Sequence, residues 1–575
     1  TYFGNRTNRN GTISSSSIDH VLANQPLKLR DYKSISSGFS DHNCTIAQVS
    51  FYTKNERKKS KSSPSFRLRR DYRKLDKKSF LRDLADKPWG SLNDVQIDQA
   101  AEMFSSFVLN LLDKFAPLRK RHIKKKKKSP FSPELRDLQK KRDQAKLDML
   151  ASDGSINPEL FAKYKSIRNK CTTLARKEKR SHLSKALQEN SSQSNVWRVV
   201  NSTINPKQIP PEIPPSLTPD SLNTYFTTKI ETLRSHIDKS MIQDPHEKLR
   251  AKMASRGLKF TFQPFSIRNV KRIIRKLKTH SAAGPDGLDV YILKLAIDII
   301  AAPLTNLINR SLTTGIVPST WKMARVIPLF KKGARDQCCN YRPISCLNIA
   351  AKVLETVAKV QISNFFEEHE LFAPSQHGYR AKRSTTSALI DMHSSWTNAL
   401  DANKSAAVLS FDLSSAFDSV DAEILCAKLE IIGFDAHSVK WIMSYLTNRS
   451  QFIQIGNNFS TTVIIARGSP QGSVLSPVLF IIFISDIDDW TDFSTLSGFA
   501  DDYSATVVDS TFQGMLEKLE HDAKKILSFM ASNRLFVNES KTTFIIFSRK
   551  ERDLPVSIKV GHSNRSSWES SLPLI

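Results

Sequence analysis

Phe499-Ala500-Asp501-Asp502 places two carboxylates side by side between residues 494–498 and the β-favouring run 503–508. This arrangement predicts a β-hairpin with an acidic tip. Carboxylates this close repel each other, and each raises the pKa of the other unless cations lie beside them. We therefore expect a divalent metal ion at the tip. The competing interpretation is an ordinary polar turn, in which Asp-Asp pairs are common.

A third carboxylate, Asp412, ends the apolar, strand-like run 406–412. If this run pairs with the acidic hairpin, Asp412, Asp501 and Asp502 meet at one point. Ligation by oxygen alone suits Mg²⁺, or Mn²⁺, better than Zn²⁺, which prefers Cys and His. Such a site binds two metal ions roughly 3.5 to 4 Å apart for in-line phosphoryl or nucleotidyl transfer.

The chain of 575 residues is long enough for several domains, and its net charge of +30 predicts a polyanionic partner. Residues 51–180 hold 36 Lys and Arg against 16 Asp and Glu, so +20 of this charge is regional. Nucleic acid is favoured over an acidic membrane surface. The alternatives are solvated helix faces and, for the lysine run 124–128, a nuclear-localisation signal.

The six cysteines are scattered and lack zinc-site spacing, which predicts a reducing, intracellular environment in the nucleus, the cytoplasm or both. The longest apolar runs, such as 478–484, fall short of the roughly 18 to 20 residues of a membrane span. No membrane partner is therefore expected. The first residue is Thr1, so we interpret the chain as a fragment.

Before residue 260 the sequence predicts two regions. Residues 1–50 form short strands and loops that contain Ser40-Asp41-His42. Residues 51–259 form a basic, mainly helical linker that binds nucleic acid, with a proline-rich break at 206–219.

A folded block starts near residue 260, where helices lead to a strand that ends at Phe330. Lys331, Lys332 and Arg342 follow this strand. Ahead of an acidic metal site they could hold a triphosphate, although surface solubility explains them as well.

Past Asp412 the pattern is strand, helix, two strands, helix and strand, which predicts an α+β fold with a split βαβ palm. One helix is expected from residue 416 to about 432, with Phe417 in its first turn. Glycines around Pro470-Gln471, including Gly472, let the backbone approach a flat ligand closely.

Seven motifs in this order resemble the reverse transcriptase of non-long-terminal-repeat (LINE-type, jockey-like) retrotransposons over about residues 260–550. They are AAGPDG, NYRPIS, QHGYR, SFDLSSAFD, RGSPQGSVLSP, FADD and NESKT. Each motif alone is modest, but together they are specific. The Ser-Asp-His tripeptide resembles the last motif of the exonuclease/endonuclease/phosphatase fold.

The resemblance implies a right-hand polymerase with fingers at 260–400, a palm at 401–550 and a largely missing thumb that begins at 551–575. A remnant of an endonuclease domain at 1–50 would precede the linker. In this remnant Asp41 would orient His42 at a phosphate. The metal-binding Glu and Asn residues of the endonuclease family would precede residue 1, so no endonuclease activity is expected from this fragment.

The resemblance also implies roles for single residues. Asp412, Asp501 and Asp502 would bind two Mg²⁺ ions, and Lys331 or Lys332 with Arg342 would bind the triphosphate. Further expected contacts are Gln471 with Gly472 at the nucleotide and template, Lys541 as proton donor to pyrophosphate, and Phe417 as a steric gate against the 2′-OH. For Phe417 the alternative is a core aromatic. Asp502→Ala is expected to be milder than Asp501→Ala, because neighbouring strand residues point to opposite faces.

The implied function is RNA-directed DNA polymerase, which copies element RNA by target-primed reverse transcription. Its partners would be an RNA template, a DNA primer or target, and dNTPs. The alternative is an inactive, element-derived fragment that only binds nucleic acid.

Overall fold

The computed structural model describes the chain in twelve segments. These are residues 4–7, 13–16, 29–35, 44–49, 66–122, 132–150, 158–188, 213–279, 281–538, 541–549, 558–559 and 567–568. Asp41, His42 and the first half of the proline-rich break, residues 206–212, lie outside the described residues. So does the predicted start of the thumb, apart from β16 (Ile558–Lys559) and β17 (Ser567–Trp568), which pair with each other.

Two antiparallel strand pairs occupy the N-terminal region. They are β1 (Gly4–Thr7) with β2 (Ile13–Ser16), and β3 (Leu29–Ile35) with β4 (Cys44–Val49). The short strands expected for residues 1–50 are therefore present.

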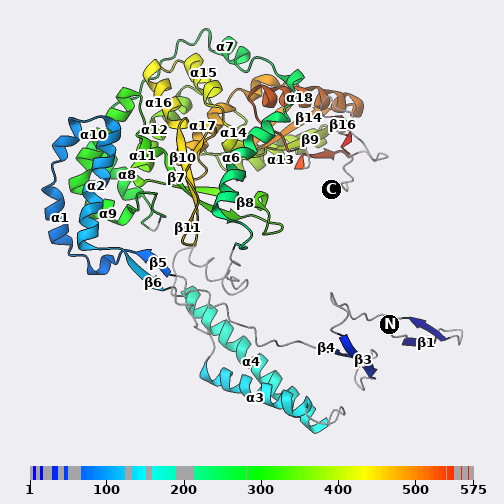
Figure 1. Ribbon diagram of the computed structural model, residues 1–575. Helices are drawn as coiled ribbons and strands as arrows, with labels where there is room; N and C mark the ends of the chain where they lie inside the picture. The colour runs from blue at the N-terminus through cyan, green and yellow to red at the C-terminus, as the bar shows by residue number, and fades with distance from the viewer. Residues whose placement is uncertain are drawn as a thin grey trace. The chain divides into compact units, whose positions relative to one another are not determined.

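A helical hairpin forms from α3 (Pro133–Leu150) and α4 (Pro158–Gln188), coloured cyan in Figure 1. Leu135, Ala145 and Cys171 are buried, and the Ser132 amide donates to Glu178 at 3.1 Å. Most other side chains of the hairpin are exposed. The exposed basic residues are Arg136, Lys140, Lys141, Lys146, Lys163, Lys165, Arg168, Lys170, Arg176, Lys177, Lys179, Arg180 and Lys185.

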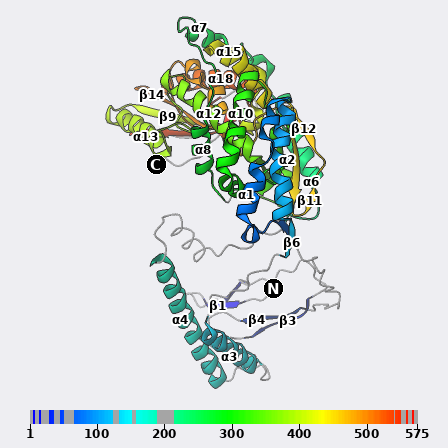
Figure 2. The same cartoon turned by 90° about the vertical axis from the view of Figure 1, so that its left-hand side faces the viewer.

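Other helices of the predicted linker pack into a large hydrophobic core. Phe80 of α1 (Lys77–Ala85) and Phe104 of α2 (Ile97–Phe115) share one cluster with Ile308 of α10 (Ile297–Thr314). Figures 1 and 2 show α2 alongside α10. Helices α1 and α2 therefore belong to the same hydrophobic core as α10, whereas the sequence predicted them within the basic linker. Their apolar stripes explain this packing.

A five-stranded sheet is built on the antiparallel hairpin of β7 and β8, against which β10 lies parallel to β7. Two short strands, β11 and β12, each pair with β10. The strands of this sheet are β7 (Met323–Phe330), β8 (Tyr341–Leu347), β10 (Arg449–Ile455), β11 (Asn458–Phe459) and β12 (Val463–Ile465). Helices α6 (Pro219–Ser235) and α11 (Ser319–Lys322) contact this sheet. The other helices of this part of the chain are α7 (Glu247–Met253), α8 (Ile267–Lys276), α9 (Val290–Leu295), α12 (Ile349–Glu368) and α13 (Thr385–Asp401).

A second sheet of four antiparallel strands has the order β13-β14-β9-β15. Its strands are β9 (Ser405–Asp412), β13 (Thr495–Phe499), β14 (Asp502–Asp509) and β15 (Thr543–Phe547). The associated helices are α14 (Ala416–Ser419), α15 (Ala422–Ile432), α16 (Ala436–Leu446), α17 (Ser476–Phe483) and α18 (Phe512–Ser532). This strand order is the one expected for a split βαβ palm.

Alternation along the strands separates the two faces of the palm sheet. Phe411 and Tyr503 are buried in the main core, which also contains residues of α17 and α18. Their neighbours Ser410 and Ser504 lie on the opposite face, where their hydroxyls are 2.8 Å apart. Because the period of a strand is two, Asp412 and Asp502 share this second face.

The helix expected from 416 to about 432 is interrupted at Val420-Asp421. The Asp421 carboxylate accepts hydrogen bonds from the amides of Glu423 and Ile424, so it caps α15 and starts a new helix. The one-helix prediction was therefore wrong. In the part of the chain that the structure describes, no helix has both the length and the apolar character needed to cross a bilayer.

Candidate active site

The acidic hairpin pairs with the strand of Asp412 as predicted. Asp502 is the first residue of β14, and its Cα lies opposite that of Asp412 in β9. Asp501 lies in the two-residue turn that precedes Asp502, because Phe499 pairs with Asp502. Since Asp501 is not in the strand, the alternation argument for a milder effect at Asp502 does not apply.

The three carboxylates influence one another electrostatically. Burial raises the pKa of the Asp502 carboxyl, the negative charges of Asp501 and Asp412 raise it further, and Lys541 opposes them. The Lys541 ammonium forms an ion pair with Asp412. The acidic group therefore already attracts one cation, the Lys541 ammonium. The carboxylate oxygens of the group are ligands that suit a hard divalent ion.

Basic residues of the fingers hairpin face the same point. Lys331 directly follows β7, and Arg342 lies in β8 opposite Leu329. Desolvation lowers the pKa of the Lys331 ammonium, Arg342 and Lys541 lower it further, and Asp412 opposes them. Lys332 is exposed and acts on Lys331 more weakly than these groups. The structure thus brings Lys331, Arg342 and Lys541 into one electrostatic group with Asp412.

Phe417 is half-buried on α14, one short turn beyond Asp412. Its ring lies 5.3 Å from the ring of Phe480, which is fully buried, and 6.3 Å from the ring of Tyr379, which is 47% exposed. Its carbonyl accepts a hydrogen bond from the Ser469 amide at 2.9 Å. One side of the ring is therefore packed in the core, and the other faces an exposed aromatic.

Gln471 and Gly472 connect palm and fingers. The side-chain amide of Gln471 donates to the Asp418 carboxylate at 2.8 Å. The main-chain carbonyl of Gln471 accepts from the Ser345 amide of β8 at 2.7 Å. Burial raises the pKa of Asp418 to about 6. Gly472 has a φ of +110°, and a Cβ there would lie 2.7 Å from the Ser345 carbonyl oxygen. Only glycine permits this approach.

A groove of about 480 Å³ adjoins the carboxylates. Asp412, Asp502 and Lys541 form its polar end, and α13 contributes Ala388 and Met392 to its apolar wall. None of Lys331, Arg342, Phe417 and Gln471 lines it. Of the predicted site residues, the groove therefore includes Asp412, Asp502 and Lys541.

Sequence reasoning quoted the motif around Gln376 and Tyr379 but assigned no role to either residue. Burial raises the pKa of the Tyr379 hydroxyl, and the charge of Asp501 raises it further, so Tyr379 lies near the acidic turn. The side chain of Gln376 contacts the turn directly. No local pattern in the sequence predicts either contact.

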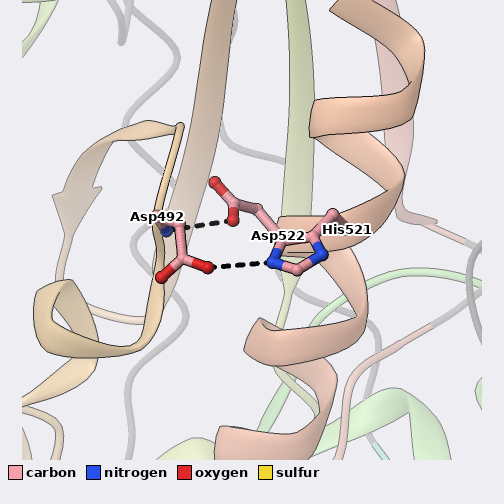
Figure 3. A group of neighbouring side chains, drawn as sticks. All are labelled: Asp492, His521 and Asp522. Atoms are coloured by element: carbon pink, nitrogen blue, oxygen red, sulfur yellow. Dashed lines mark hydrogen bonds and ion pairs between the residues drawn. The ribbon is translucent and has the colours of Figure 1, made fainter. Parts of the chain in front are cut away.

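Asp492, His521 and Asp522 form a second acidic group (Figure 3). The Asp522 carboxylate accepts three backbone hydrogen bonds, from residues 492, 493 and 494. Asp492 is paired with His521 at 2.9 Å and with Lys525, and these bonds lower its pKa to about 2. Because both carboxylates and the imidazole already have hydrogen-bond or ion-pair partners, we interpret this group as a structural link between the loop before β13 and α18.

Comparison with known proteins agrees with this geometry. Residues 330–565 match the family described as reverse transcriptase (RNA-dependent DNA polymerase). Two relatives from Drosophila melanogaster are each 26% identical: the probable RNA-directed DNA polymerase from transposon BS, over 46% of this chain and 29% of its own length, and the RNA-directed DNA polymerase from mobile element jockey, over 50% and 32%.

A third relative comes from another insect. It is the retrovirus-related Pol polyprotein from type-1 retrotransposable element R2 of Popillia japonica, 29% identical over 40% of this chain and 31% of its own length. The chain thus spans about a third of the length of these curated relatives. With its carboxylates, its palm sheet and these relatives, the chain carries a reverse transcriptase domain of the non-long-terminal-repeat retrotransposon type.

Proposed function

We propose that this chain is an RNA-directed DNA polymerase that extends a DNA primer on an RNA template by target-primed reverse transcription. The observation that carries the proposal is the pairing of Asp412 with Asp502 beside the turn residue Asp501. Two carboxylates on paired strands and a third in the adjoining turn form a ligand set suited to nucleotidyl transfer with two Mg²⁺ ions. An intracellular site of action, in the nucleus, the cytoplasm or both, is part of this proposal.

Asp412, Asp501 and Asp502 would hold the Mg²⁺ ions, for which Mn²⁺ could substitute. Bound there, the ions would stabilise the negative charge that develops as the 3′-OH attacks the α-phosphate. Lys331 and Arg342 would bind the phosphates of the incoming dNTP. Lys541 would give its proton to the leaving pyrophosphate, because its ammonium already lies at Asp412.

The groove under α13 would receive the primer end. Asp412, Asp502 and Lys541 line this groove, whereas Lys331 and Arg342, which are expected to bind the dNTP phosphates, do not. This difference favours the primer end as the occupant of the groove. Its volume of about 480 Å³ and its contact with Asp412 suit a terminal nucleotide whose 3′-OH must reach the carboxylates.

Primer extension on an RNA template, with and without Mg²⁺, tests the proposal. We expect Mg²⁺-dependent dNTP incorporation. The alternative, a fragment that only binds nucleic acid, predicts template binding without incorporation under all metal conditions. That result would reject the polymerase assignment.

Replacing Phe417 with Ala is expected to raise incorporation of rNTP relative to dNTP. Phe417 follows Asp412 by five residues. In the proposed role its half-buried ring would meet a 2′-OH, and a smaller side chain removes that clash. The ratio of the two kcat/KM values should shift toward rNTP by about 10-fold or more. An equal loss for both substrates, together with a lower melting temperature, would identify Phe417 as a core residue instead.

The α3–α4 hairpin is expected to supply the salt-sensitive share of nucleic-acid affinity. Deleting residues 51–180 is not a clean test, because α1 and α2 are in the core. Changing four exposed bases to Gln, namely Lys140, Lys163, Lys170 and Lys177, leaves the packing intact. The slope of log affinity against log salt should fall by about 0.7 for each single-strand phosphate that the variant no longer neutralises. An unchanged slope would show that these lysines are only a solvated surface.

A further inference from the structure

Gln376 has no part in the function proposed above, yet its side chain is 1% exposed and fully hydrogen-bonded. Its Oε1 accepts from the Ala500 amide at 2.9 Å and from the Gly378 amide at 2.7 Å. Its Nε2 donates to the Ala500 carbonyl at 3.2 Å and to the Tyr503 hydroxyl at 2.9 Å. One side chain thus bonds both backbone polar groups of Ala500.

Ala500 is a residue that needs such support. It is the first of the two turn residues of the acidic hairpin, and its φ is +61°. This left-handed region disfavours residues with a Cβ, and tight hairpin turns usually place Gly or Asn there. The amide of Gln376 supplies the bonds that a neighbouring strand would offer. It therefore stabilises a backbone conformation that Ala500 does not prefer.

The segment around Gln376 is itself fixed to the hairpin. The His377 amide donates to the Gly498 carbonyl at 2.8 Å, and the Gly498 amide donates to the Ser375 carbonyl at 2.9 Å. A Cβ at Gly378 would lie 2.4 Å from the Ala500 nitrogen, so the two backbones are in direct contact. A displacement of residues 375–378 would therefore also displace the turn at Ala500.

We propose that Gln376 is a positioning residue that holds the turn at Ala500 and thereby aims Asp501 and Asp502 at the metal site. The inference rests on the proposed function, because it assigns the two carboxylates to metal binding. It goes beyond that function by naming a residue that touches neither nucleotide nor metal but decides how well the carboxylates converge. A change at Gln376 should therefore weaken metal binding and leave the affinity for nucleic acid unchanged.

Gln376→Glu and Gln376→Ala in the full chain test the inference. Glu keeps the volume and the acceptor atoms, loses both donated bonds, and places a carboxylate oxygen against the Ala500 carbonyl. The probe is Mn²⁺ alone, measured as free ion by electron paramagnetic resonance. We expect the Mn²⁺ dissociation constant to rise about tenfold in both variants, with RNA affinity unchanged. In Gln376→Glu the loss should shrink as the pH falls, since neutral Glu donates a hydrogen bond again.

Asn223→Asp is the matched control, because it makes the same amide-to-acid change at another buried residue. Asn223 is 2% exposed, donates to Ser460 at 3.0 Å and to Thr461 at 2.9 Å, and accepts from Gln451 at 3.0 Å. Its loss should lower the melting temperature measured without metal while Mn²⁺ affinity stays at the parental value. A general effect of buried amides would change both variants alike.

Parental Mn²⁺ affinity in both Gln376 variants would overturn the positioning role. So would an equal loss of Mn²⁺ affinity in Asn223→Asp. A parental chain that binds Mn²⁺ but does not extend primers would reject the proposed function while leaving the positioning role testable and, with the expected shifts, supported. A parental chain that binds no Mn²⁺ would overturn both.

Discussion

Asp412→Ala and Asp501→Ala should each lower dNTP incorporation by about 10³-fold or more, while RNA affinity stays at the parental value. Each change removes a carboxylate from the proposed metal site, where bound ions would contribute several kcal/mol of transition-state stabilisation. Asp412 also carries the ion pair with Lys541, so its loss frees this ammonium as well. The exposed basic residues of α3 and α4, to which we assign most of the affinity for the phosphate backbone of nucleic acid, are unchanged.

Single-turnover primer extension and a separate RNA-binding titration measure the two quantities. Asp298→Ala serves as control, because Asp298 is an exposed carboxylate on α10 that pairs with Lys271 at 2.7 Å. It should extend primers at the parental rate. Parental rates in both active-site variants would refute the assignment of Asp412 and Asp501 as metal ligands.

Lys428→Met should destabilise the polymerase unit by about 3 to 5 kcal/mol, because it leaves a buried charge without its partner. Lys428 of α15 and Asp486 are both 0% exposed, with Nζ 2.6 Å from Oδ1. The ammonium also donates to the Phe483 carbonyl at 2.8 Å and lies 5.2 Å from the centre of the Phe529 ring. Burial lowers the pKa of Lys428, and Asp486 opposes this shift.

The double variant Lys428→Met, Asp486→Leu tests the cause. Two apolar side chains of similar volume leave no charge buried, so most of the lost stability should return. Urea denaturation of the parental, single and double variants gives the coupling energy. A double variant as unstable as Lys428→Met would show that the loss comes from packing alone. Asp486 immediately precedes η6 (Ile487–Trp490), which leads toward β13, so this pair anchors the chain before the acidic hairpin.

The sequence by itself determined the palm sheet and the identity of its carboxylates. Strand periodicity is a local property, and it predicted β9 and the acidic hairpin close to their observed bounds. The acidic pair at the turn was visible because like charges side by side have no stabilising role in a fold. The break at Asp421 was missed, since a side chain that caps a helix competes there with the helical pattern.

Only the tertiary structure decided how distant segments meet. The pairing of Asp502 with Asp412 depends on the register between β14 and β9, which no single strand specifies. Gln376 reaches Ala500 across 124 residues, and α1 enters the core beside α10 although its surroundings in the sequence are strongly basic. The physical reason is the same in each case. A buried polar group needs a hydrogen-bond partner and an apolar face needs a surface to pack against, and the residues between the two partners in the sequence do not specify which distant segment supplies it.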